Sequence, residues 1–77
     1  MSFIERYKRE NKEAVAKVLD FFNNNSTQAA LYFGLSVPSI SSWRKRGRIS
    51  KRIAEKIGDD NNLPFSKEEI RSDILVW

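Results

Sequence analysis

Cysteine and histidine are both absent from this 77-residue sequence. Without cysteine the chain can form neither a disulfide framework nor a thiolate metal site. Without histidine it lacks the commonest metal ligand and the commonest general base. The sequence contains no glycine-rich phosphate loop either. We therefore expect no metal, no cofactor, no small-molecule substrate and no catalytic residues, and the protein is predicted not to be an enzyme.

Long apolar runs and targeting segments are also missing. The longest stretch without a charged residue, 21–43, is rich in Asn, Ser, Thr and Gln. A membrane-spanning helix needs about 20 mostly apolar residues, so this stretch does not qualify. The N-terminus has no apolar segment followed by a cleavage site. We therefore expect a cytoplasmic protein without membrane contact, and the length fits one small domain over 1–77.

Positive charge is concentrated in one segment. The chain carries 14 Lys and Arg against 10 Asp and Glu, which gives a net charge of +4. Residues 44–58 contain seven basic side chains and one acidic one, whereas residues 26–43 contain no charge. A focused basic patch is typical of proteins that bind polyanions. A basic run alone is more often a solvated helix face, so the residues before it decide between these interpretations.

The spacing of apolar residues predicts helices and no β-sheet. Apolar side chains recur at intervals of three and four residues over 14–22, and the three asparagines that follow end this helix. Phe3, Ile4 and Tyr7 could extend this helix upstream, but residues 8–13 are all polar, so 1–13 is treated as an N-terminal extension whose first turn could be separate. Further helices are predicted over 27–33, 37–46 and 51–57, with a short one after residue 66. Their predicted N-caps are Ser26, Ser36, Ser50 and Ser66, and their predicted ends are Gly34, Gly47 and Gly58.

The second and third predicted helices must meet at a steep angle, because only three residues join them. Close backbones at such a crossing require a small side chain, which Ala30 supplies. Ile40 and Trp43 lie three residues apart, so they share one helix face and can fill the crossing as core residues. Leu31 and Leu35 complete the predicted apolar set. The opposite face of the third helix carries small or polar side chains, and the major groove of B-DNA is wide enough to admit such a helix.

This corner resembles the helix-turn-helix of phage and bacterial repressors. The matching positions are Ala30, Gly34, Leu35, Ile40 and Trp43.

The chain is similar, more narrowly, to the Cro-like YdaS group of phage and prophage regulators. Trp43-Arg44-Lys45 followed by Arg48-Ile49-Ser50 fits that group, which often closes with a segment of the form E-[LI]-R-P-D-[IV]. This chain has Glu69-Ile70-Arg71-Ser72-Asp73-Ile74, with serine in place of the usual proline. It also has Val37-Pro38 where glutamine is common in the group.

The resemblance implies an all-α, lambda-repressor-like domain of four to five helices, with the helix-turn-helix at 26–46 and a C-terminal packing or dimerisation segment at 63–77. It implies a homodimeric repressor that binds double-stranded DNA at a palindromic operator in a bacterial or phage-infected cell. The side chains implied to contact base edges are Ser36, Val37, Pro38, Ser39, Ser41, Ser42 and Lys45. Those implied to grip the DNA backbone, besides Lys45, are Ser26, Thr27, Gln28, Arg44, Arg46, Arg48, Lys51 and Arg52.

Other functions stay open on the sequence alone. A phage activator or an excisionase-type architectural protein would use the same fold to contact polymerase or to bend DNA. An antitoxin-like interaction module would instead bind another protein. Residues 74–77 could form a short strand, a packed tail or, with Phe65 and Ile70, the dimer surface. The rival dimer surface consists of Phe3, Ile4 and Tyr7.

Overall fold

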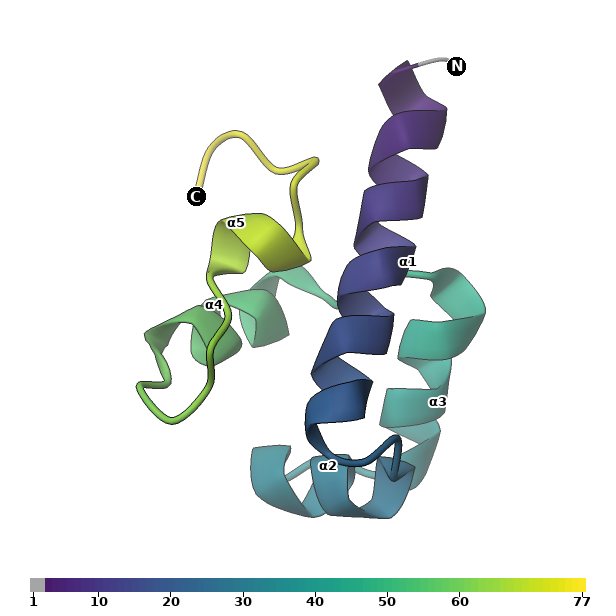
Figure 1. Ribbon diagram of the computed structural model, residues 1–77, viewed down its shortest axis with the longest axis vertical. Coiled ribbons are helices and arrows are strands. Elements are labelled where there is room, and N and C mark those ends of the chain that lie inside the picture. The colour runs from purple at the N-terminus through teal and green to yellow at the C-terminus, as the bar shows by residue number, and fades with distance from the viewer. Residues whose placement is uncertain (1–2) are drawn as a thin grey trace.

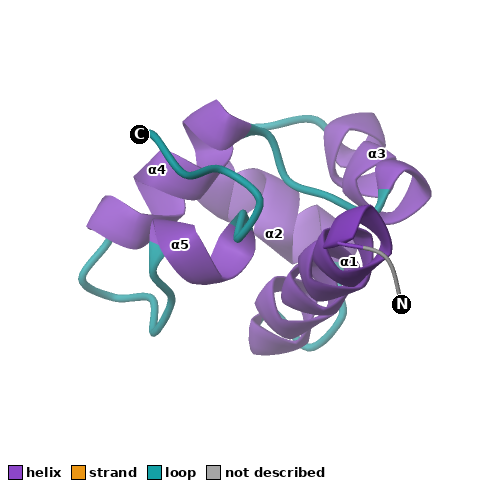
Figure 2. Ribbon diagram, turned by 90° about the horizontal axis from the view of Figure 1, so that it is seen from above, coloured by secondary structure: helices purple, strands orange, loops and turns teal. Residues whose placement is uncertain are grey.

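The computed structural model describes residues 3–77, in which the chain forms five helices: α1 (Phe3–Phe21), α2 (Ser26–Phe33), α3 (Val37–Arg46), α4 (Lys51–Asp59) and α5 (Lys67–Ile70). No strand occurs in this range, which confirms the all-α class. α2 lies across one end of α1, and α3 runs back alongside α1 (Figure 1). Figure 2 shows α4 and α5 packed together on another side of α1.

α1 is a single continuous helix of 19 residues, so the upstream extension through Phe3, Ile4 and Tyr7 is confirmed and the alternative of a separate first turn is wrong. Its polar stretch is held by the C-terminal segment. Asn11 is only 5% exposed, and its Nδ2 donates to Asp73 Oδ1 at 3.1 Å. The Ser72 hydroxyl donates to Glu10 Oε2 at 2.7 Å. The predicted extension is therefore part of the folded domain from residue 3 onward, and its residues 1–2 lie outside the described range.

Side-chain caps define where the helices begin. The predicted N-caps Ser36, Ser50 and Ser66 are confirmed, and Ser66 forms a capping box with Glu69. For α2 the predicted cap is wrong by one residue, because Asn25 caps this helix and Ser26 is its first residue. The Asn25 side-chain oxygen accepts the two backbone N–H groups of Thr27 and Gln28. Asparagine is as good an N-cap as serine, so either residue could have served.

Two glycines end helices as predicted, and one does not. Gly34 and Gly47 follow α2 and α3 with φ angles of 67° and 72°, a left-handed conformation that costs glycine little. α4 instead continues through Gly58 to Asp59. A Cβ atom at Gly58 would lie 2.8 Å from the backbone nitrogen of Lys67. Gly58 therefore serves the close approach of α4 and α5 rather than a helix end.

The core forms where α1 meets the other helices. Ile40, Ala30 and Trp43 are buried in it, as predicted, and Leu35 packs against its edge. Leu31 was predicted to join them but is 77% exposed, because Ala29 takes the inward position of α2. The buried apolar residues are Ala14, Val15, Val18, Leu19, Phe22, Ala29, Ala30, Ile40, Trp43, Ile49, Ile53, Ala54, Ile57, Leu63 and Ile70.

The segment after α5 is a packed tail rather than a strand. Trp77 is partly buried against the core, whereas Leu75 and Val76 are exposed. Ile70 is only 1% exposed, so its predicted place on a dimer surface is wrong. No helix within residues 3–77 is both long enough and apolar enough to cross a membrane.

Candidate nucleic-acid interface

The corner between α2 and α3 fixes which side of α3 faces outward. Gly34 donates its backbone N–H to the carbonyl groups at the end of α2, and the chain then turns into the Ser36 cap of α3. Ile40 and the Trp43 ring point into the core, where Trp43 meets the Phe33 ring edge-on at a centroid distance of 5.9 Å. Because a helix turns once every 3.6 residues, the residues opposite these two must face solvent.

The outward face of α3 contains part of the set of residues that were predicted to read base edges. Pro38, Ser41 and Lys45 lie near its middle, at spacings of three, four and seven residues, and all three are exposed. Val37 is exposed at one margin of this face. The face is therefore built of short side chains with one long cation near its end, which allows close approach of a second surface.

The serine hydroxyls on α3 are not equivalent. Ser36 Oγ accepts the backbone N–H of Ser39, and the hydroxyls of these two residues also lie 2.9 Å apart. Ser42 Oγ donates to the carbonyl of Pro38 at 3.0 Å, so its proton is used within the helix. Ser41 forms no side-chain hydrogen bond within the described range. Of the predicted serine readers, Ser41 is therefore the one best able to both donate and accept.

The start of α2 also faces outward. Thr27 and Gln28 are exposed and Ser26 is partly buried, so all three residues predicted to contact the DNA backbone lie at the surface of the corner. The exposed Leu31 follows Gln28 by three residues and extends the same face of α2. Sequence reasoning placed Leu31 in the core and so missed this position.

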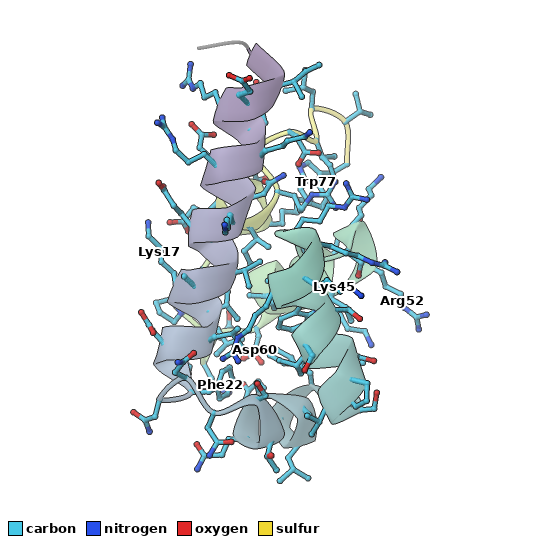
Figure 3. All side chains as sticks on the ribbon, turned by 90° about the vertical axis from the view of Figure 1, so that its right-hand side faces the viewer. Lys17, Phe22, Lys45, Arg52, Asp60 and Trp77 are labelled. Carbon is cyan, nitrogen blue, oxygen red and sulfur yellow. The ribbon has the colours of Figure 1, made fainter. Side chains whose placement is uncertain are left out.

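The basic residues around the end of α3 point in several directions. Arg44 is directed towards the end of α1, where its Nη2 donates to Asn24 Oδ1 at 2.6 Å. Arg46 and Arg48 line a shallow cleft with Ser39 and Ser42 on the α4 side of α3. Figure 3 shows Lys17 and Arg52 on opposite sides of the molecule, with Lys45 on α3 between them.

Lys51, like Arg44, is a predicted contact to the DNA backbone whose side chain binds another part of the protein. Its ammonium nitrogen lies 3.5 Å from the carbonyl oxygen of Val76 and 5.9 Å from the centre of the Trp77 ring. Lys67 approaches the same ring at 5.3 Å. A lysine held between a carbonyl and an aromatic face has less freedom to reach a phosphate than its neighbour Arg52.

Three carboxylates with lowered pKa values are paired with groups outside the basic segment. Hydrogen bonds from Arg71 lower the pKa of Asp73 to about 2. The Tyr32 hydroxyl donates to Asp60 at 2.6 Å and lowers the pKa of that carboxyl. Hydrogen bonds from Ser72 and then Arg6 lower the pKa of Glu10.

The basic segment itself has no counter-ion in the described range. The ion pairs within residues 3–77 are Arg6–Glu10 and Arg71–Asp73, and neither includes a cation of residues 44–52. The positive charge of this segment therefore remains available to an external polyanion.

Two further cations that sequence reasoning missed belong to the same surface. Lys8 and Lys12 of α1 line a cleft together with Lys45 and Arg48. Their four-residue spacing was a signal, but it places them on one face only if α1 is continuous through residues 8–13.

Comparisons with protein-family models, with curated proteins and with solved structures found no match to this chain.

Proposed function

We propose that this protein binds double-stranded DNA, with α3 lying in the major groove. The observation that carries the proposal is the outward face of α3, where short side chains adjoin a basic segment that has no counter-ion among residues 3–77. Short side chains let a helix approach base edges, and Ser41 can donate to or accept from them. Cations at the margin of the groove contact phosphates, which orient the protein and supply most of the affinity.

Within this class we propose a Cro-like phage or prophage regulator that represses transcription in the bacterial cytoplasm. The resemblance of the Glu69–Ile74 segment to the closing segment of that group supports this proposal, and the segment has a structural role in the fold. Glu69 completes the capping box of α5, Ile70 is buried, and Arg71 pairs with Asp73. Such a protein contacts its DNA without a cofactor and performs no catalysis.

The protein is further proposed to act as a homodimer on a palindromic operator. One recognition helix reads only a few base pairs, and related architectures gain specificity by binding half-sites one helical turn apart. The exposed Leu75 and Val76 are the apolar residues of the C-terminal segment best suited to form the dimer surface. On the rival surface Ile4 is exposed, while the side chain of Phe3 lies outside the described range. The variant Leu75→Lys/Val76→Lys should reduce the steepness of the operator-binding curve, which reports cooperative binding by the dimer. The variant Ile4→Lys should leave that steepness unchanged.

The test begins with selection of binding sites from random duplex DNA, followed by titrations at several salt concentrations. Ser41→Ala should weaken binding to the selected site by roughly 5-fold or more and leave scrambled DNA unaffected, because it removes a base contact. Arg52→Ala should weaken both DNAs and lower the slope of log affinity against log salt by roughly 0.9, because it removes a phosphate contact. Lys17→Ala is the matched control on the opposite side of the molecule.

Each competing function has its own outcome in this test. Tandem direct repeats in the selected sites, or DNA bending, would favour the activator or architectural protein. Binding without sequence preference, with Ser41→Ala indistinguishable from the parent, would contradict a reading role for α3. Absence of DNA binding would favour the antitoxin-like interaction module.

A further inference from the structure

The N-terminal half of α1 places two lysines, Lys8 and Lys12, beside the C-terminal end of α3. α1 extends past the C-terminal end of α3 (Figure 1), and a cleft of about 540 Å³ lies between the two helices. Lys8 and Lys12 line this cleft from α1. Lys45, Arg46 and Arg48 line it from the end of α3 and the following loop.

Packing holds these cations together despite their mutual repulsion. The Lys12 stem lies over the α3 cap, because a Cβ atom built on Gly47 would lie 3.9 Å from Lys12 Cβ. Lys12 is thereby kept beside the C-terminal end of α3, where the helix dipole favours positive charge. Asp73 is the acidic residue of the cleft lining, and its carboxylate already accepts hydrogen bonds from Arg71 and Asn11. The cleft therefore presents several cations, and the carboxylate in its lining is already engaged.

We propose that this cleft binds the sugar-phosphate backbone of the DNA segment that flanks the groove occupied by α3. The inference rests on the proposed DNA binding and adds Lys8 and Lys12, on α1, to the contact surface. Lys8 and Lys12 are separated by about 6 Å along the helix axis. Phosphates recur about every 3.4 Å of duplex axis on each strand, so a separation of about 6 Å corresponds to nearly two phosphate steps, and the two ammonium groups can serve two phosphates of one strand.

The experiment compares two doubly substituted full-length proteins with the parent. Lys8→Gln/Lys12→Gln removes the cleft charges and keeps aliphatic stems that can pack. Arg9→Gln/Lys17→Gln removes the same charge from exposed positions of α1 that do not line the cleft. Binding to a selected duplex and to a scrambled duplex is titrated by fluorescence anisotropy at several salt concentrations, and thermal melting checks that all three proteins are equally folded.

The cleft variant should lower the salt slope by roughly 0.9 for each phosphate that is no longer neutralised, or about 1.8 in total, on both duplexes. Its ratio of affinities for the two duplexes should match that of the parent. The control variant should retain the parent slope. Equal slopes for the two variants, with a parent that still discriminates between the duplexes, would overturn this inference and leave the proposed function intact.

The reverse failure is also distinguishable. A parent that binds both duplexes alike, together with a slope lowered only in the cleft variant, would support the phosphate site and contradict sequence reading by α3. A parent that binds neither duplex would overturn both proposals.

Discussion

Arg71 holds Asp73, two residues further along the chain, through two hydrogen bonds of 2.9 Å from its Nε and Nη2 atoms. Its Nη1 atom donates to the carbonyl of Ile49 at 2.9 Å, and Asn11 of α1 donates to the same Asp73. One ion pair thus joins the tail to α1 and to the loop between α3 and α4. A bidentate, charge-assisted contact of this kind is stronger than an ordinary hydrogen bond.

Asp73→Asn should therefore destabilise the protein at neutral pH and leave its stability in acid nearly unchanged. The pKa of Asp73 falls from 3.8 to about 2 on folding, so the charged pair stabilises the fold above pH 4. That contribution declines as the pH falls below about 4 and is lost as the pH falls through 2, and its size is about 1–2 kcal/mol once partial exposure is allowed for. Urea unfolding at pH 7 and at a pH below 2 measures it. Equal losses at both pH values, or an equal effect of the exposed Asp20→Asn, would contradict this role.

Trp43→Ala should remove most of the stability of the domain. The Trp43 side chain is 6% exposed and fills the crossing of α2 and α3, and removal of a large buried aromatic residue costs about 3–5 kcal/mol. Small domains have total stabilities near the lower end of about 5–15 kcal/mol. Urea unfolding followed by circular dichroism gives the loss, with the partly buried Trp77→Ala as the comparison. A Trp43 variant that unfolds at the parent's urea concentration would show that the corner does not depend on this ring.

Gly58→Ala tests two opposing effects. Alanine in place of glycine inside a helix favours folding by about 0.5–1 kcal/mol. The new Cβ atom would meet the Lys67 backbone at 2.8 Å, and such overpacking costs about 1–3 kcal/mol. We expect a net loss of about 1 kcal/mol, visible as a lower melting temperature, whereas Glu55→Ala in the same helix should change it little. A more stable Gly58→Ala protein would show that α5 can move away from α4.

Lys51→Ala should lower the salt dependence of DNA binding less than Arg52→Ala does. Both residues lie in the first turn of α4, but Lys51 is engaged by Val76 and Trp77. Removing Arg52 should reduce the salt slope by the full value of roughly 0.9 for one phosphate contact. Titrations at several salt concentrations compare the two variants. A larger change for Lys51 would mean that the tail leaves it when DNA binds.

The sequence predicted most of the helices and the side of α3 that faces outward. Local signals were sufficient there, because Ser36, Ser50 and Gly47 act on their own backbone neighbourhood. Ile40 and Trp43 were placed correctly because their spacing admits only one shared face. The resemblance implied which residues of α3 would read bases, and that remains a prediction; the sequence did not reveal that Ser42 uses its proton on Pro38.

The remaining features depend on partners that are distant in the sequence. α1 is continuous through its polar stretch because Asn11 and Glu10 bond to residues 62 positions away. Gly58 lies within a helix because the backbone of α5 packs against it. Leu31 is exposed because α2 presents Ala29 to the core instead, which depends on how α2 is rotated against α1. The position of Lys8 and Lys12 beside α3 was missed for the same reason, because the two lysines share one helix face only when α1 is continuous.

The hydrogen bonds that join Asn11 and Glu10 to the tail also bear on how the protein is made. A ribosome adds about 5–20 residues per second, and the α2–α3 corner can form from residues close together in the chain. The first half of α1 leaves the exit tunnel early, but its partners Ser72 and Asp73 are translated 62 residues later. The first half of α1 therefore lacks these two hydrogen-bond partners until residues 72 and 73 have been translated. α1 and the tail can pack together only after that point.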